Sequence, residues 1–125
     1  MNCKYCNFVK TIDDLYVKEV NFTATELITE NYFIFRKIGK ICYIYGYCQV
    51  SSISNSPTLG NILGTLSVKP ITNIRDTIAV SDKPWNAPES IQYALISTNE
   101  GQIDIHSNTN YQSKCLYGSF VFVCK

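Results

Sequence analysis

Few residues of this chain have side chains whose type and spacing could do chemistry, and the clearest pair lies near the C-terminus. Asp104 and His106 are two positions apart in an alternating segment, opposite Ile103 and Ile105. Side chains two apart on a strand share a face, so this carboxylate and imidazole could together hydrogen-bond neighbouring hydroxyl groups of one ligand. The alternative is an ordinary solvated strand face.

Two other positions could serve the same kind of ligand. Trp85 is the only tryptophan and lies between Pro84 and Pro88, in a segment that must be a loop because proline cannot donate to a sheet. An indole offers a flat apolar face and an N–H group to a sugar ring. The alternative for Trp85 is a loop anchor that packs on the core or on a neighbouring subunit. Arg75, beside Asp76 in a variable loop, is a further candidate.

The sequence does not assemble a catalytic centre. The acidic residues are scattered, no Gly-x-Ser-x-Gly motif occurs, and His106, the only histidine, has no serine or cysteine at a recognisable spacing. A polar loop separates Cys115 from His106. We therefore expect a protein that is not an enzyme.

The six cysteines predict neither a metal site nor a cofactor. Cys3 and Cys6 supply half of a tetrahedral zinc site, but no second pair follows, although a symmetric oligomer could bring several such pairs together. Cys42, Cys48 and Cys124 lie in alternating segments, where a free cysteine behaves as a small buried hydrophobe. We expect them to be reduced, since no signal peptide supports the alternative of disulfides.

Composition limits the partners. With 125 residues and 46% hydrophobic content, the chain can build one core. A net charge of +1 with only 17% charged residues argues against a nucleic-acid partner. The longest uncharged apolar run, residues 41–48, is much shorter than the roughly 20 residues that span a bilayer, so no membrane insertion is expected.

The elements that must position the candidate residues are short strands. Residues 31–37 and 41–51 alternate on either side of Gly39 and predict a hairpin, and residues 90–98 and 102–107 predict a second hairpin. Strands separated by glycine, proline and asparagine predict an all-β antiparallel sandwich or barrel. The other predicted elements are strands at 20–29, 77–81 and 116–124 and a loop at 51–61. Residues 1–20, with mixed charges, are expected to form an N-terminal arm or connector, and residues 21–125 the head domain.

Two predicted strands are apolar on both faces, which is more than one small sandwich needs. Three tyrosines alternate with cysteine and isoleucine in residues 42–48, and phenylalanine alternates with valine in residues 120–124. Such surface favours burial against copies of the same chain. The candidate interface residues are Tyr43, Tyr45, Tyr47, Phe120 and Phe122.

The order Tyr-Phe-Ile-Phe-Arg-Lys-Ile-Gly-Lys-Ile-Cys-Tyr-Ile-Tyr-Gly-Tyr at residues 32–47, followed by Ile-Leu-Gly-Thr-Leu at 62–66, resembles the C-terminal head domains of phage tail fibres and baseplate receptor-binding proteins. Residues 99–105, Asn-Glu-Gly-Gln-Ile-Asp-Ile, fit the family's later strand pair with one insertion. The sequence departs from the family at Ser67, where proline is usual, and at residues 68–70, where Val-Lys-Pro replaces Tyr-Arg-Pro. The likeness covers residues 30–124.

The resemblance implies a jelly-roll-like β-sandwich head that assembles as a homotrimer and attaches to bacterial surface saccharides without catalysis. Several related heads bind saccharides in clefts between protomers and use aspartate, histidine, tryptophan and arginine. It therefore singles out Trp85, Asp104, His106 and Arg75 as glycan-binding candidates. It also implies a virion location, at the tail-fibre or baseplate tip, after synthesis in the bacterial cytoplasm.

Two other functions stay open. One is a purely structural trimerising tip or baseplate module that binds only protein. The other is a secreted trimeric domain of the tumour-necrosis-factor kind, which shares the sandwich plan but is disfavoured by the lack of a signal sequence and of a paired-cysteine framework.

Overall fold

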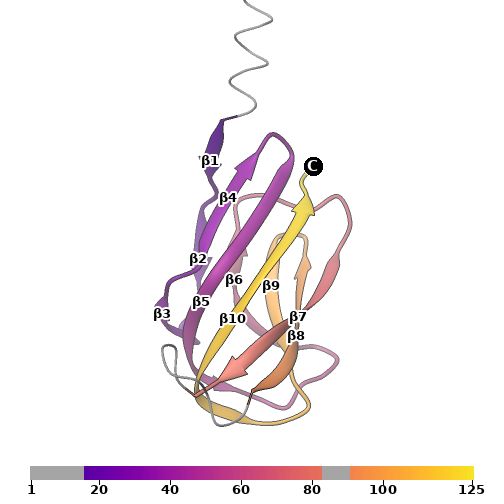
Figure 1. Ribbon diagram of the computed structural model, residues 1–125. Helices are drawn as coiled ribbons and strands as arrows, with labels where there is room; N and C mark the ends of the chain where they lie inside the picture. The colour runs from indigo at the N-terminus through magenta and orange to yellow at the C-terminus, as the bar shows by residue number, and fades with distance from the viewer. Residues whose placement is uncertain (1–15, 83–90) are drawn as a thin grey trace, which may run out of the picture.

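The computed structural model describes residues 16–82 and 91–125, and within them every regular secondary-structure element is a β-strand. All pairings between these strands are antiparallel, and together they form one curled sheet in the shape of a half-barrel (Figure 1). The all-β antiparallel prediction is therefore confirmed. The strands are β1 (Val17–Glu19), β2 (Phe22–Ala24), β3 (Ile28–Asn31), β4 (Ile34–Ile38), β5 (Ile41–Ile53), β6 (Asn61–Leu66), β7 (Ile74–Ser81), β8 (Gln92–Asn99), β9 (Gln102–His106) and β10 (Tyr111–Val123).

The strand order explains why the sheet curls. It runs β1-β4-β5-β10-β7-β8-β9-β6-β2, with β3 paired beside β5. β1 and β2 stand at opposite ends of this order, yet only two residues separate them in the sequence. Val20 N–H donates to the carbonyl of Phe35 in β4, and the N–H of Ser67, which follows β6, donates to the Asn21 carbonyl, each at 2.9 Å. One extended segment thus joins both ends of the sheet.

Both predicted hairpins are confirmed. β4 and β5 are joined through residues 39–40, and β8 and β9 through Glu100 and Gly101. Glu100 and Gly101 have φ values of 55° and 93°, and two successive positive φ angles are typical of the type I′ turn that matches the twist of paired strands. Gly101 is required there, because a Cβ would lie 2.8 Å from the Val68 carbonyl oxygen.

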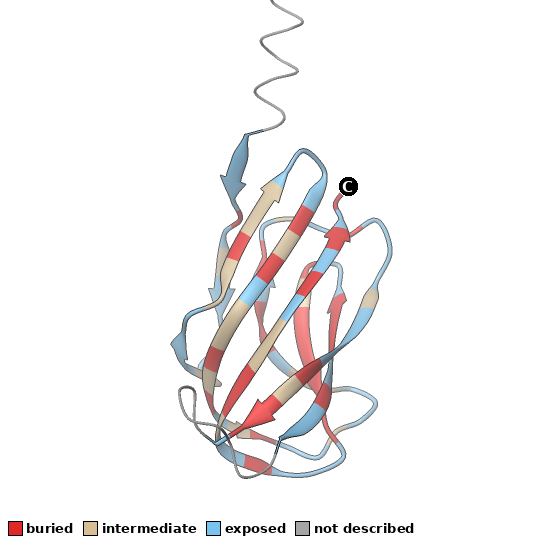
Figure 2. Ribbon diagram, in the orientation of Figure 1, coloured by how far each residue is buried: buried red, intermediate tan, exposed pale blue. Residues whose placement is uncertain are grey.

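The two longest strands form the centre of the sheet. β5 and β10 pair along their length, and β10 also pairs with β7, so the last strand lies inside the sheet. Buried and exposed positions alternate along much of both strands (Figure 2). The inward side chains join a core with the inward residues of β6, β8 and β9. Its largest fully buried side chains are Ile44, Ile53, Leu63, Ile78, Ile105 and Leu116.

The cysteines of the described residues belong to this interior. Cys42, Cys48 and Cys124 are buried free thiols, as expected, and Cys115 is a fourth. Burial raises the pKa of both Cys42 and Cys48 to about 12. These thiols therefore stay protonated and act as small apolar side chains at neutral pH.

The structure corrects part of the predicted oligomer interface. Phe120 and Phe122 are buried in the core of a single chain, because they are the inward residues of β10. The exposed side chains of that segment are Val121 and Val123. Among the predicted tyrosines, Tyr45 is exposed, whereas Tyr43 and Tyr47 are half-buried.

Several strand limits differ from the predictions, and pairing with distant strands is the reason. The segment 20–29 is two strands, β2 and β3, which pair with β6 and β5 respectively. β5 and β10 extend into polar stretches because each supplies the other's backbone hydrogen bonds. β1 pairs with β4, so the sheet begins before residue 21. Residues 1–15 of the expected arm lie outside the described residues.

Among the residues that the structure describes, no helix has the length and apolar character needed to span a membrane.

Candidate functional site

A pocket of about 510 Å³ opens beside strands β7, β8 and β9. It brings together Arg75, Asp104 and His106, three of the four side chains that the sequence singled out for ligand binding. The fourth, Trp85, lies outside the described residues. The pocket is lined by Thr58, Leu59, Asn73, Ile74, Arg75, Ser97, Thr98, Asn99, Asp104 and His106.

The register of three neighbouring strands places these groups on one face. Arg75 of β7 is paired with Ser97 of β8, and Ser97 is paired with Asp104 of β9. Directly opposed residues of an antiparallel ladder point to the same side of the sheet. This is the face away from the core, because Ile103 and Ile105 fill the other side of β9.

Asp104 and His106 do not form a solvated strand face, and that alternative is wrong. Their exposed fractions are only 5% and 7%. The loop at residues 54–60 covers His106, and Gly60 in this loop has a φ of 79°. A Cβ at Gly60 would stand 2.8 Å from Cε1 and 2.9 Å from Nδ1 of the His106 ring. Glycine therefore lets the loop approach the ring closely.

His106 has one ring nitrogen bonded and the other free of protein partners. Its Nε2 lies 2.7 Å from Ser97 Oγ, while its Nδ1 has no hydrogen-bond partner among the described residues. The same holds for the buried hydroxyl oxygen of Thr98. A buried polar atom without a partner costs free energy. Neither atom is open to the pocket, because Gly60 covers His106 Nδ1 and Thr98 is paired with the inward Ile103.

Ser97 is a site residue that sequence reasoning missed. It precedes His106 by nine positions, and only the β8–β9 hairpin makes them neighbours. A serine and a histidine at this distance also occur in acyl-transfer enzymes, where a third group orients the histidine through its other nitrogen. Within the described residues, His106 Nδ1 has no such partner, and the Ser97–His106 pair is buried beneath the loop at residues 54–60.

Of the two charged groups in the pocket, Asp104 has a hydrogen-bond partner in the described residues and Arg75 has no ion-pair partner there. Asp104 Oδ1 accepts a hydrogen bond of 2.9 Å from Gln102 Nε2, which leaves its second oxygen as an acceptor. Arg75 is exposed, and within the described parts of the chain it has no carboxylate at ion-pair distance. The pocket thus offers both donors and an acceptor to a polar ligand.

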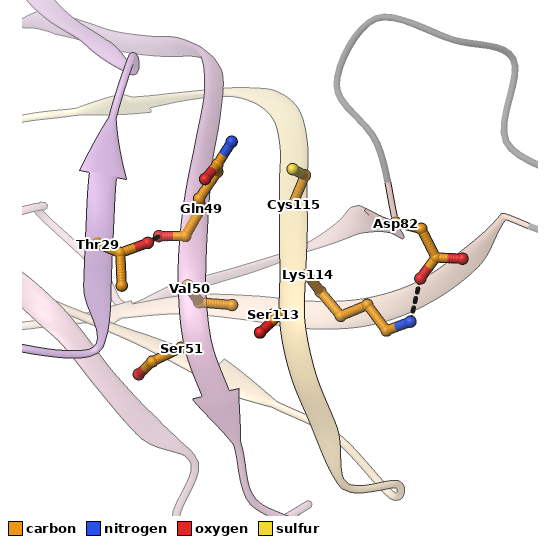
Figure 3. Close-up of a pocket in the computed structure, with 8 residues that line it drawn as sticks. All are labelled: Thr29, Gln49, Val50, Ser51, Asp82, Ser113, Lys114 and Cys115. Carbon is orange, nitrogen blue, oxygen red and sulfur yellow. Dashed lines mark hydrogen bonds and ion pairs between the residues drawn. The ribbon is translucent and has the colours of Figure 1, made fainter.

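A second hollow, of about 270 Å³, lies beside β5 and β10 (Figure 3). Thr29, Gln49, Ser51 and Ser113 contribute polar groups to its lining. Its only cation, Lys114, forms an ion pair with Asp82. Because that charge is already neutralised, we regard the first pocket as the candidate site.

Metal ligands do not gather in either hollow. Within residues 16–82 and 91–125, no group of three histidine, cysteine or acidic side chains could hold a metal ion. The Cys3 and Cys6 pair lies outside the described residues.

The outer face of the sheet also carries an apolar strip that the sequence revealed only in part. Val17, Ile38, Ile41 and Val123 are successive partners across β1, β4, β5 and β10, and all four are exposed. Together with Tyr45 and Val121, which are also exposed, they form what we call the outer apolar face. Contiguous apolar surface of this kind marks interaction sites.

Comparisons of the chain with known protein families, with curated proteins and with solved structures found no match.

Proposed function

We propose that this chain is the receptor-binding head of a phage or prophage tail fibre, which attaches to glycans of the bacterial cell surface and performs no catalysis. The observation that carries this proposal is the pocket that gathers Arg75, Asp104 and His106 on one face of the sheet. Saccharides present hydroxyl groups that both donate and accept, and this pocket offers a carboxylate and a guanidinium to them, with the Ser97–His106 pair beside the carboxylate.

The outer apolar face supports the second part of the proposal, a homotrimer. A single chain leaves valine, isoleucine and tyrosine side chains exposed across neighbouring strands. Contact between copies would remove this surface from water, and three copies would carry three sites. Weak individual sites then give firm attachment when they bind one cell surface together.

Glycan arrays probed with the purified chain, clustered on beads, test the proposal. We expect retention on a defined set of bacterial saccharides and loss of that retention in Asp104→Asn, which removes the charge but preserves the shape of the side chain. Asp76→Asn, a change of the same chemistry at an exposed position outside the pocket lining, is the matched control and should bind like the unmodified chain.

Three outcomes of this experiment decide the proposal. Retention that Asp104→Asn abolishes and Asp76→Asn does not would support it. A folded chain that binds no saccharide even when clustered would refute it. Equal binding by both variants would show that this pocket does not bind the glycan.

The second candidate function is a structural tip or baseplate module that binds only protein, and the outer apolar face favours it. The two candidates differ in what pocket variants do. A structural module would keep host attachment unchanged in Asp104→Asn, whereas loss of the outer apolar face would abolish assembly.

A further inference from the structure

We propose that the pocket selects a saccharide that carries a carboxylate, such as a uronic acid, and that Arg75 with Asn73 binds this carboxylate. This inference rests on the proposed function, because it names the ligand class of the same site. It follows from which hydrogen-bonding groups of the pocket are already used and which remain.

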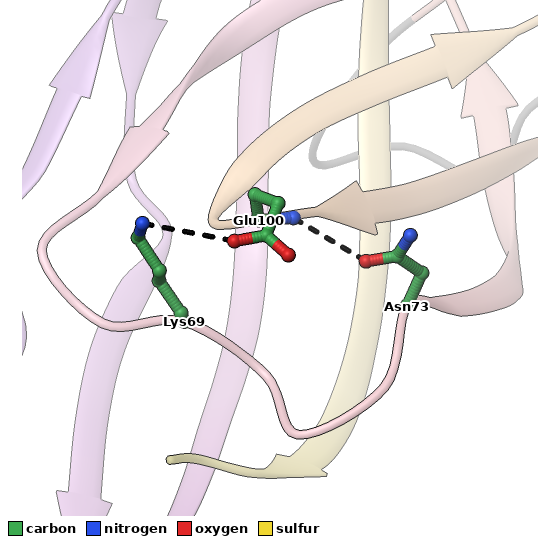
Figure 4. Close-up of polar contacts among 3 residues, drawn as sticks. All are labelled: Lys69, Asn73 and Glu100. Carbon is green, nitrogen blue, oxygen red and sulfur yellow. Dashed lines mark hydrogen bonds and ion pairs between the residues drawn. The ribbon is translucent and has the colours of Figure 1, made fainter.

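The first step concerns Asn73. Its Oδ1 accepts a hydrogen bond of 3.3 Å from the backbone N–H of Glu100 in the β8–β9 turn (Figure 4). An asparagine side chain has one carbonyl oxygen and one NH₂ group. The turn engages one lone pair of the oxygen and fixes the orientation of the amide, and the NH₂ group has no hydrogen-bond partner among the described residues, so Asn73 offers a ligand its NH₂ donor.

The second step concerns the carboxylate of Glu100, which could otherwise compete for Arg75. Glu100 Oε2 lies 3.6 Å from Lys69 Nζ, on the side of the turn away from Asn73 (Figure 4). The Glu100 carboxylate of the turn is therefore paired with Lys69. Arg75 is left without an ionic partner in the described residues, and its guanidinium has only donors.

The third step joins the two donors. Asn73 and Arg75 both line the pocket and flank Ile74 at the start of β7. Both residues contribute donor groups to the same pocket, and a ligand group that only accepts fits such donors. A carboxylate is such a group, and its two oxygens match the planar fork of an arginine.

The charge of the pocket favours a carboxylate over a phosphate. Arg75 is the one cation in the lining, and Asp104 supplies a negative charge deeper in the same pocket. The charges of Arg75 and Asp104 cancel, so a carboxylate adds one negative charge to the pocket, whereas a phosphate adds nearly two and is repelled more strongly by Asp104. The remaining sugar hydroxyls would then reach the second oxygen of Asp104.

The test compares each of several acidic oligosaccharides, oligogalacturonate and hyaluronan fragments among them, with its carboxyl-reduced neutral form and with sugar phosphates. The unmodified chain should bind at least one acidic form roughly 10-fold more tightly than the reduced form, the size expected for one charge-assisted hydrogen-bonded contact. Arg75→Gln should abolish this preference, and Arg75→Lys should retain part of it. Arg36→Gln, the same change at the only other arginine, should leave the preference intact.

The outcomes separate this inference from the proposed function. Equal binding of acidic and reduced sugars, or a preference for sugar phosphates, would overturn the carboxylate assignment while glycan binding stands. Preserved selectivity in Arg75→Gln would also overturn it. If the folded chain binds none of these sugars and no glycan on the array, both proposals fail.

Discussion

At the scale of single residues, three of the side chains that the sequence singled out line one pocket, but the sequence did not predict their environment. Asp104 and His106 were chosen for their type and their spacing of two, and that spacing does put them on one face. Their burial follows from Gly60, whose loop comes from a distant part of the chain and covers the His106 ring. Ser97 was missed because its contact with His106 exists only across a strand pair.

The buried thiols give a prediction for alkaline pH. Burial raises the pKa of Cys42 and Cys48 from an ordinary value of 9.0 to about 12. Below pH 9 both thiols are protonated in the folded and the unfolded chain. Above it only the unfolded chain releases these protons, so the free energy of unfolding should fall as the pH rises from 9 towards 12.

Urea unfolding under reducing conditions at a series of pH values measures this effect. The pKa of Tyr47 and Tyr117 is also raised, mainly by burial, and adds to the same trend. The variants Cys42→Ala and Cys48→Ala should therefore each lose stability at pH 7 but show a shallower decline above pH 9. If the free energy of unfolding of both variants falls with pH as steeply as that of the unmodified chain, the raised pKa of these thiols is contradicted.

At the scale of elements, the local sequence pattern predicted the structures that depend on neighbouring residues, which are the two hairpins. Both hairpins could be found because alternation and turn residues lie within twenty positions. The split of residues 20–29 into β2 and β3 could not be found, since it reflects pairing with β6 and β5 far along the chain. The pocket has the same origin, because Thr58 and Leu59 reach it only through the β6–β9 pairing.

The β8–β9 turn provides a test at this scale. Gly101→Ala places a Cβ at a φ of 93° and 2.8 Å from a carbonyl oxygen, which should cost roughly 1–3 kcal/mol of stability. Glu100→Gly in the same turn should cost less, because Glu100 already has a positive φ and its exposed ion pair with Lys69 contributes little. Thermal and urea unfolding would measure both. A larger loss in Glu100→Gly would contradict this view of the turn.

At the scale of the whole molecule, the core side chains and the outer apolar face lie on opposite faces of the same strands. The sequence predicted that the final strand is apolar on both faces, which the structure confirms. It could not tell which face belongs to the chain's own core, because that depends on how the sheet curls. The phenylalanines point inward and the valines outward.

This separation predicts different effects for neighbouring residues. Val121→Asp should reduce the oligomeric mass and leave a folded chain, because Val121 is 60% exposed on the outer apolar face. Phe120→Ala should instead destabilise the fold by about 3–5 kcal/mol, as expected for a truncated core aromatic. Leu59→Asp, at an exposed apolar residue away from that face, is the control for sedimentation and should keep the native mass. A monomeric unmodified chain would contradict the trimer.

The most direct test of the central claim, that the pocket beside β7, β8 and β9 binds a saccharide, is a crystal structure of the chain with the glycan that it retains on an array. We predict sugar density in this pocket, with oxygen atoms of the sugar at hydrogen-bond distance from Asp104 and Arg75. Density only in the hollow beside Lys114, or only in a cleft between protomers with this pocket empty, would contradict it.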